Sequence, residues 1–117
     1  LMSMIIIINE PPSSSKTWNA LRTTAALLSN DEDVEIFLMN DGVFNALHNQ
    51  NPPDEIKGQS TSEKIKQLVE IGAKAFYCSQ CAETRGITKD QINAEIEKSN
   101  LIELSKKIQN TSKTINM

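Results

Sequence analysis

Short apolar runs alternate with amphipathic stretches along most of this chain. Met4 to Ile8 is an unbroken apolar run rich in isoleucine, which is typical of a strand covered on both faces, as in a parallel sheet. The runs Val34 to Met39 and Ala73 to Cys78 predict two further strands, and Thr114 to Met117 predicts a short terminal one.

Between these runs, apolar residues recur every three or four positions, which predicts helices. The pattern favours one helix over Lys16 to Ser29, one over residues 61–71, and one that begins at Asn100. Gly72 is well placed to end the second of these in a left-handed conformation. A short helix is expected after Asp41, which we interpret as its cap.

Two segments are harder to interpret from pattern alone. Asn49 to Gln59 is a polar loop of eleven residues, long enough to indicate a functional or interface role. Thr88 to Gln91 has the spacing of a helix capping box, whereas Ile92, Ala94 and Ile96 alternate as in a strand. Periodicity leaves both interpretations of the second segment open.

Strands that alternate with helices predict an α/β fold, a three-layer sandwich in which helices cover both faces of a mainly parallel sheet. The length of 117 residues is that of one domain, so we expect residues 1–117 to fold as a unit. Ligand crevices in such sheets lie beyond the carboxyl ends of the strands. With strand order 2-1-3, the crevice would lie between Asn9 to Ser15 and Cys78 to Gly86.

Charge and hydropathy exclude several classes of partner. The net charge is −3 and the lysines are scattered, so the chain offers no basic surface for a nucleic acid. Leu1 to Ile8 is too short to span a bilayer and lacks the features of a signal peptide. We therefore expect a cytoplasmic protein with no membrane partner.

The only thiols of the chain belong to Cys78 and Cys81, which lie three positions apart where a strand gives way to a helix. The unpaired N–H groups of a helix start lower the pKa of a nearby thiol. Arg85 would add to this effect and Glu83 would oppose it. A lowered pKa matters because a free cysteine, with a pKa of about 8.5, is mostly protonated at neutral pH. The alternative is that both thiols are unreactive core residues.

The sequence gives little support for a zinc, phosphate or flavin site. A structural zinc site needs four donors, and besides the two cysteines the chain offers only His48, which we interpret as a polar surface residue. Ser13 to Ser15 follows the first strand without any glycine, so helix capping is favoured there over phosphate binding. Trp18 and Phe44 are interpreted as core or subunit contacts rather than as stacking platforms for a flavin.

Several stretches read together resemble the DsrE/DsrF-like family, and within it the small YchN-like proteins. The stretches are Ile8 to Pro12, Trp18 to Arg22, Ile36 to Val43, Cys78 to Cys81, and Arg85-Gly86. The resemblance implies a flavodoxin-like fold with a mainly parallel five-stranded sheet, in which Gln91 to Ile96 is a strand. It also implies assembly into a homotrimer or homohexamer.

In sulfur-relay members of that family, a cysteine at the position matching Cys78 carries a persulfide and passes its outer sulfur to the next protein. The resemblance therefore suggests Cys78 as the persulfide carrier. The chemistry of disulfide exchange then makes Arg85 the candidate for its electrostatic support, and Cys81 the candidate for a resolving thiol that discharges the persulfide as a Cys78–Cys81 disulfide. Partners would be sulfur donor and acceptor proteins, with no tightly bound organic cofactor. One departure is that Ser13-Ser14 stands where relatives usually carry Tyr-Gly. A second hypothesis is an oligomeric binding or scaffold module, or a thiol redox sensor, without sulfurtransferase activity.

Overall fold

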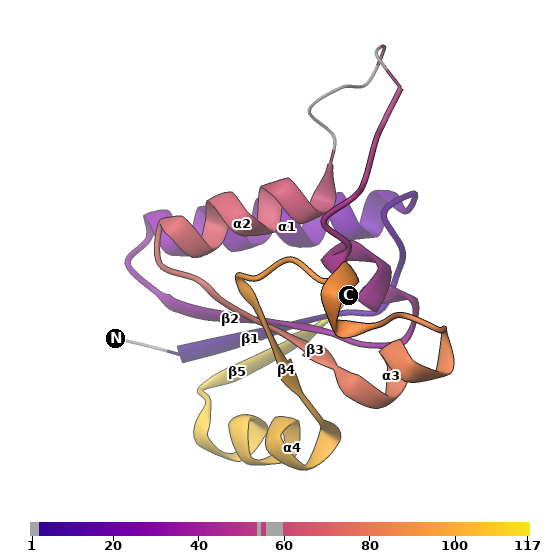
Figure 1. Cartoon of the computed structure of the whole chain (residues 1–117). Helices are drawn as coiled ribbons and strands as arrows, with labels where there is room; N and C mark the ends of the chain where they lie inside the picture. Colours follow the sequence, from indigo (N-terminus) through magenta and orange to yellow (C-terminus); the bar gives the residue numbers. More distant parts are fainter. Residues whose placement is uncertain (1–2, 54, 56–59) are drawn as a thin grey trace.

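A five-stranded sheet forms the centre of the molecule (Figure 1). The computed structural model describes residues 3–53, 55 and 60–117. The strands are β1 (Ser3–Ile8), β2 (Asp33–Leu38), β3 (Lys74–Cys78), β4 (Ile96–Ser99) and β5 (Lys113–Asn116). All of their pairings are parallel, as the unbroken apolar runs predict.

The strand order is β4-β3-β2-β1-β5. The order 2-1-3 is therefore wrong, because β5 rather than β3 occupies the second side of β1. At the carboxyl edge of the sheet, the end of β2 therefore lies between the ends of β1 and β3. The loop after β2 thus separates the two segments that were expected to frame a crevice.

Helices cover both faces of the sheet. The helical elements are α1 (Ser15–Ser29), η1 (Asn40–Ala46), α2 (Thr61–Glu70), α3 (Ser79–Thr84), η3 (Lys89–Gln91) and α4 (Leu101–Asn110). In Figure 1, α1 and α2 lie together on one face and α4 lies on the other. This arrangement confirms the three-layer α/β sandwich.

Side chains at the helix starts explain why the long helices begin where they do. Ser14, Ser60 and Asn100 each accept a hydrogen bond from a backbone N–H in the first turn of α1, α2 and α4. After α2, Gly72 adopts a φ of 122°, as a glycine terminator requires. The helices predicted over Lys16 to Ser29 and over residues 61–71 are accordingly confirmed.

The segment between α3 and α4 differs from the strand that the family resemblance suggested. Thr88 and Gln91 form a capping box around the short helix η3, and β4 begins only at Ile96. The strand expected over Gln91 to Ile96 is therefore wrong, because the capping box turns the chain there. In sheet pairing, Ile92 forms an isolated antiparallel bridge with Leu47.

The long polar loop is described in part. Asn49 to Pro53 contains neither helix nor strand, as Pro52-Pro53 predicts. The rest of the predicted loop, at residues 54 and 56–59, lies outside the described residues.

Two apolar clusters form the core, one on each side of the sheet. The larger one joins the sheet to α1 and α2 through residues such as Ile6, Leu21 and Ile65. The smaller one lies on the α4 side, and its members are Ile5, Ile7, Phe37, Phe76, Cys78 and Leu104. The first cysteine of the pair is thus part of the packed core.

Candidate functional site

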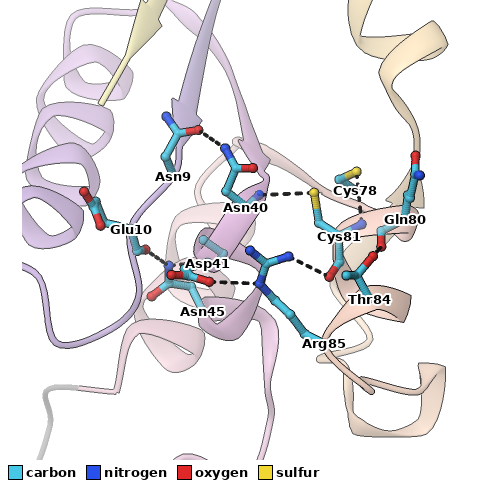
Figure 2. A network of polar contacts seen from close by, with 11 residues as sticks. Asn9, Glu10, Asn40, Asp41, Asn45, Cys78, Gln80, Cys81, Thr84 and Arg85 are labelled. Carbon is cyan, nitrogen blue, oxygen red and sulfur yellow. Dashed lines mark hydrogen bonds and ion pairs between the residues drawn. The ribbon is translucent and has the colours of Figure 1, made fainter.

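Three strand ends meet at the carboxyl edge of the sheet, and the segments that follow them carry most of the polar contacts described below. Asn9 follows β1, Asn40 and Asp41 follow β2, and Cys78 ends β3 and is followed by Ser79 to Arg85. Figure 2 shows Asn9 and Cys81 both beside Asn40, and Arg85 beside Asp41. This is the edge at which parallel sheets usually bind ligands.

Cys78 is both the last residue of β3 and the N-cap of α3. Its Sγ accepts a hydrogen bond from the backbone N–H of Cys81 over 3.5 Å. The side chain is only 1% exposed, because it points into the apolar cluster on the α4 side. Cys78 thus has the helix N–H that the sequence predicts, but no access to solvent.

The pKa of Cys78 is raised, which is opposite to the expected direction. Burial is the largest cause, since a thiolate loses hydration in an apolar cluster. The backbone N–H groups of Cys81 and Gln80 act in the lowering direction, while the side chain and charge of Cys81 raise the pKa further. The prediction of an accessible, readily ionised Cys78 is therefore wrong, because desolvation outweighs the helix start.

Cys81 is the accessible member of the pair. It is half-buried and packs at the border of both apolar clusters. Its Sγ accepts a hydrogen bond from the backbone N–H of Asn40 over 3.2 Å (Figure 2). The second cysteine therefore combines partial exposure with a backbone donor directed at its sulfur.

The backbone of Asn40 is held in an unusual conformation. Its φ is 53°, in the left-handed region that asparagine tolerates better than most residues. Its side-chain Nδ2 donates to Oδ1 of Asn9 over 2.9 Å, which ties the loop after β2 to the end of β1. These two features fix the N–H group that meets Cys81.

Arg85 does not support Cys78 in the way that the sequence suggests. Its Nε donates to Asp41 Oδ1 over 2.9 Å, and a terminal guanidinium nitrogen donates to the backbone carbonyl of Cys81 over 3.1 Å. Arg85 is not among the causes of the raised pKa of Cys78. Instead, it joins α3 to η1 and so holds Cys81 beside Asn40.

The loop after β2 also packs tightly against the end of β1. A Cβ atom placed on Gly42 would lie 2.0 Å from the carbonyl oxygen of Ile8, so only glycine allows this approach. Asn45 is fully buried, and its Nδ2 donates to the carbonyl oxygens of Glu10 and Gly42 over 2.8 and 3.0 Å. Glycine and asparagine thus fix η1 in place.

Sequence reasoning missed some of these roles. Asp41 was expected to cap a helix, but η1 has Met39 at its N-cap and no side-chain cap, and Asp41 instead pairs with Arg85. Asn9, Asn40 and Asn45 were not predicted to act together. A signal was present in the asparagines that directly follow the first two strands, since asparagine favours turns and left-handed conformations.

The remaining candidates lie apart from this network. His48 Nε2 lies 2.7 Å from the carbonyl oxygen of Asp90, beside η3. Trp18 is half-buried, packs against the larger cluster and borders a cavity of about 670 Å³ between the start of α1 and Gln50 to Pro53. Within residues 3–53, 55 and 60–117, no three His, Cys, Asp or Glu side chains group as metal ligands do. None of the helices in these ranges combines the length and the apolar character needed for a membrane crossing.

Comparison with known sequences identifies the family. The sequence model of the DsrE/DsrF-like family matches residues 2–117, which is almost the whole chain. The chain belongs to the DsrE/DsrF-like family.

Curated relatives cover about three quarters of each chain. An uncharacterized protein of Methanopyrus kandleri is 32% identical over 93 residues, which are 80% of this chain and 74% of the relative. An uncharacterized protein of Methanocaldococcus jannaschii is 30% identical over 92 residues, 78% of each chain. A protein named as a TusC homolog, from Aliivibrio fischeri, is 28% identical over 88 residues, 74% of each chain.

Solved structures agree with the fold. The YchN protein of E. coli is 25% identical and superimposes with a TM-score of 0.90 over 100% of both chains. A protein of unknown function from Methanobacterium thermoautotrophicum has a TM-score of 0.77 at 14% identity, with complete coverage of both chains. The YchN-like architecture suggested by the sequence is confirmed.

Proposed function

We propose that this DsrE/DsrF-like protein is a sulfur carrier that holds a persulfide on the Cys78–Cys81 pair and passes its outer sulfur to an acceptor. The observation that carries the proposal is the placement of both thiols on the first turn of α3, at the carboxyl edge of the sheet. One sulfur of the pair is half-exposed and accepts a backbone N–H, as a site of sulfur exchange requires. The similarity to a TusC homolog supports a relay with donor and acceptor proteins.

The chemistry of such a carrier needs no bound cofactor. A thiolate of the pair attacks the outer sulfur of a donor persulfide, and the donor leaves as a thiolate. An acceptor thiolate later takes the outer sulfur by the same reaction. Alternatively, the second thiol of the pair attacks the inner sulfur, which forms a Cys78–Cys81 disulfide and releases hydrosulfide. Both thiols are free in this structure, and a reducing compartment such as the cytosol would keep them so.

Arg85 has a positioning role in this proposal. Because its guanidinium bonds both Asp41 and the carbonyl of Cys81, it keeps α3 docked on η1. Its hydrogen bonds go to Asp41 and to the carbonyl of Cys81, so its effect on sulfur exchange would pass through the position of Cys81.

The test is sulfur loading measured by intact mass. The protein, reduced and then freed of reductant, is incubated with inorganic polysulfide, and we expect a gain of one sulfur atom. The double variant Cys78→Ser/Cys81→Ser is the control and should gain none, since it lacks both thiols. No gain of sulfur by the unaltered protein would refute the proposal.

One observation favours a different function. Burial of Cys78 and its raised pKa suit a thiol that serves packing, as in a binding or scaffold module or a slow redox sensor. Intact mass separates these functions when the loaded protein is then incubated with an acceptor thiol and the reduced protein with an oxidant. A scaffold takes up no sulfur, whereas a redox sensor forms a disulfide with an oxidant but does not transfer sulfur to an acceptor thiol.

We also propose that the protein acts as a homotrimer or homohexamer, as the family resemblance suggests. Leu101 and Ile102 support self-association, because they are 48% and 70% exposed at the start of α4. They follow β4, whose last residue, Ser99, is the register partner of Cys78. The apolar surface that they form therefore lies along the same edge of the sheet as the cysteines.

A further inference from the structure

The two thiols of the pair differ in access to a reaction partner. Cys78 is 1% exposed within the cluster of Ile5, Ile7, Phe37, Phe76 and Leu104, whereas Cys81 is half-buried. A thiolate attacks a donor persulfide only when the two sulfur atoms come into contact. In this conformation, an external sulfur atom can reach Cys81 but not Cys78.

The two thiols also differ in how negative charge on sulfur would be stabilised. The N–H of Asn40 points at Sγ of Cys81 over 3.2 Å, and hydrogen bonds to a charged acceptor are stronger than those to a neutral one. The same donor is in place before and after reaction, because the left-handed backbone of Asn40 and its bond to Asn9 fix it. Cys78, in contrast, lies among hydrocarbon side chains that disfavour a thiolate.

The pair is nevertheless close enough to act together. Residues three apart on the first turn of a helix have neighbouring side chains, and the N–H of Cys81 donates to Sγ of Cys78 over 3.5 Å. Any sulfur that reaches Cys78 in this conformation must therefore come from Cys81.

We propose that Cys81 is the thiol that receives sulfur from the donor, which exchanges the roles that the sequence suggested for the two cysteines. This inference rests on the proposed sulfur-carrier function. In the step, the Cys81 thiolate attacks the outer sulfur of a donor hydropersulfide, and a new sulfur–sulfur bond forms as the bond within the donor breaks. The donor leaves as a thiolate with the bonding electron pair, and the transferred sulfur keeps its proton or loses it to solvent.

Single-cysteine variants test this assignment. Serine is a matched replacement at both positions, because its hydroxyl oxygen can accept the N–H that the sulfur accepts now. The probe is glutathione hydropersulfide, and the readout is the rate of gain of one sulfur atom by intact mass. We expect Cys78→Ser, which keeps only Cys81, to take up sulfur, and Cys81→Ser, which keeps only Cys78, to load at least about tenfold more slowly than Cys78→Ser.

The outcomes separate this inference from the function on which it rests. If the unaltered protein does not load, the proposed function itself is refuted. If it loads and Cys81→Ser loads equally fast, or Cys78→Ser does not load, the assignment to Cys81 is wrong while the carrier function stands. In guanidinium, where the chain is unfolded, both variants should gain sulfur at the same rate. This control shows that each remaining thiol can react with the donor once it is exposed.

A second pair of variants tests the donor at Asn40. Asn40→Gly keeps the N–H and tolerates a φ of 53°, whereas Asn40→Val disfavours that backbone conformation. Both variants lose the bond to Asn9, so they differ chiefly in backbone conformation, and we expect the valine variant to load several-fold more slowly than the glycine variant at equal far-ultraviolet circular dichroism. Equal loading of the two variants would overturn the role of this N–H group.

Discussion

At the scale of single residues, the site is governed by competition between a helix start and desolvation. Cys78 accepts the N–H of Cys81, which favours its thiolate, but burial acts more strongly in the other direction. Cys81 lies three residues later, where the same turn comes back to the surface. Two thiols of one short motif therefore differ in exposure because they face different surroundings.

The raised pKa of Cys78 predicts a particular dependence on pH. In Cys81→Ser, the remaining thiol should react slowly with iodoacetamide at neutral pH and should need a more alkaline solution than a free cysteine before it reacts fast, because burial raises its pKa. Intact mass after timed quenching measures the rate, and Cys78→Ser, which keeps only Cys81, is the comparison. Fast alkylation of Cys78 at neutral pH would contradict the structure.

The same shift has a consequence for stability, and its sign follows from proton binding. A raised pKa means that the folded chain holds the Cys78 proton more tightly than the unfolded chain does. This contribution to the free energy of unfolding is complete below the pKa of the unfolded thiol. It is lost as the pH rises through the folded value, so the protein should become less stable in alkaline solution.

At the scale of elements, the site depends on how η1 sits between β1 and α3. Arg85 and Asp41 join η1 to α3, while Gly42 lets η1 approach the last carbonyl of β1. An exposed ion pair contributes at most about 1 kcal/mol, so close packing at Gly42 is the stronger restraint. The position of the Asn40 N–H therefore depends mainly on that glycine.

A glycine comparison tests this restraint. Gly42→Ala should lower the free energy of unfolding by about 1–3 kcal/mol, because the new Cβ would collide with the carbonyl oxygen of Ile8. Gly86→Ala is the matched control, since its φ is 72° but no atom lies within 4 Å of the added Cβ, and it should cost roughly 1 kcal/mol. Urea unfolding measures both. A smaller loss in Gly42→Ala than in Gly86→Ala would contradict the packing described here.

Local signals predicted most elements of this fold, and long-range pairing explains where prediction failed. The caps at Ser14, Ser60 and Asn100 lie beside the residues that they serve, so the starts of three helices followed from sequence. The place of β5 beside β1 depends on contacts between the two ends of the chain, which no local pattern specifies. The strand order, and with it the loop that faces the cysteines, was therefore missed.

The candidate site was predicted in part for the same reason. The position of Cys78 at the junction of a strand and a helix followed from local pattern. Its burial did not, because Leu104 and the β1 isoleucines that surround it come from distant segments. The ion-pair partner of Arg85 could not be predicted from local pattern either, since Asp41 is 44 residues away in the chain.

At the scale of the whole molecule, apolar surface and the cysteines share one edge of the sheet. Leu101 and Ile102 begin α4 on that edge, whereas Ile71, which is 64% exposed, follows α2 at the opposite edge, just before β3. Both isoleucines are solvent-exposed in the single chain. Only Leu101 and Ile102 are placed to form an interface that includes the two cysteines.

This difference gives a test of assembly. Ile102→Lys should abolish a trimer or hexamer without lowering the melting temperature of the chain by more than a few degrees, because the side chain is exposed. Ile71→Lys is the matched control and should leave assembly unchanged. Native mass spectrometry gives the subunit number. An Ile102→Lys variant that assembles normally would place the interface elsewhere.

Cys78 ends a strand, caps a helix and fills a core position, so one residue has three structural roles. A substitution at Cys78 that changes the reactivity of the thiol therefore also disturbs the packing of the core and the start of α3. Cys81 is half-buried and does not cap a helix, so a substitution there should change thiol reactivity with less effect on the fold. Redesign of this protein for another nucleophile, such as selenocysteine, should therefore begin at the second cysteine.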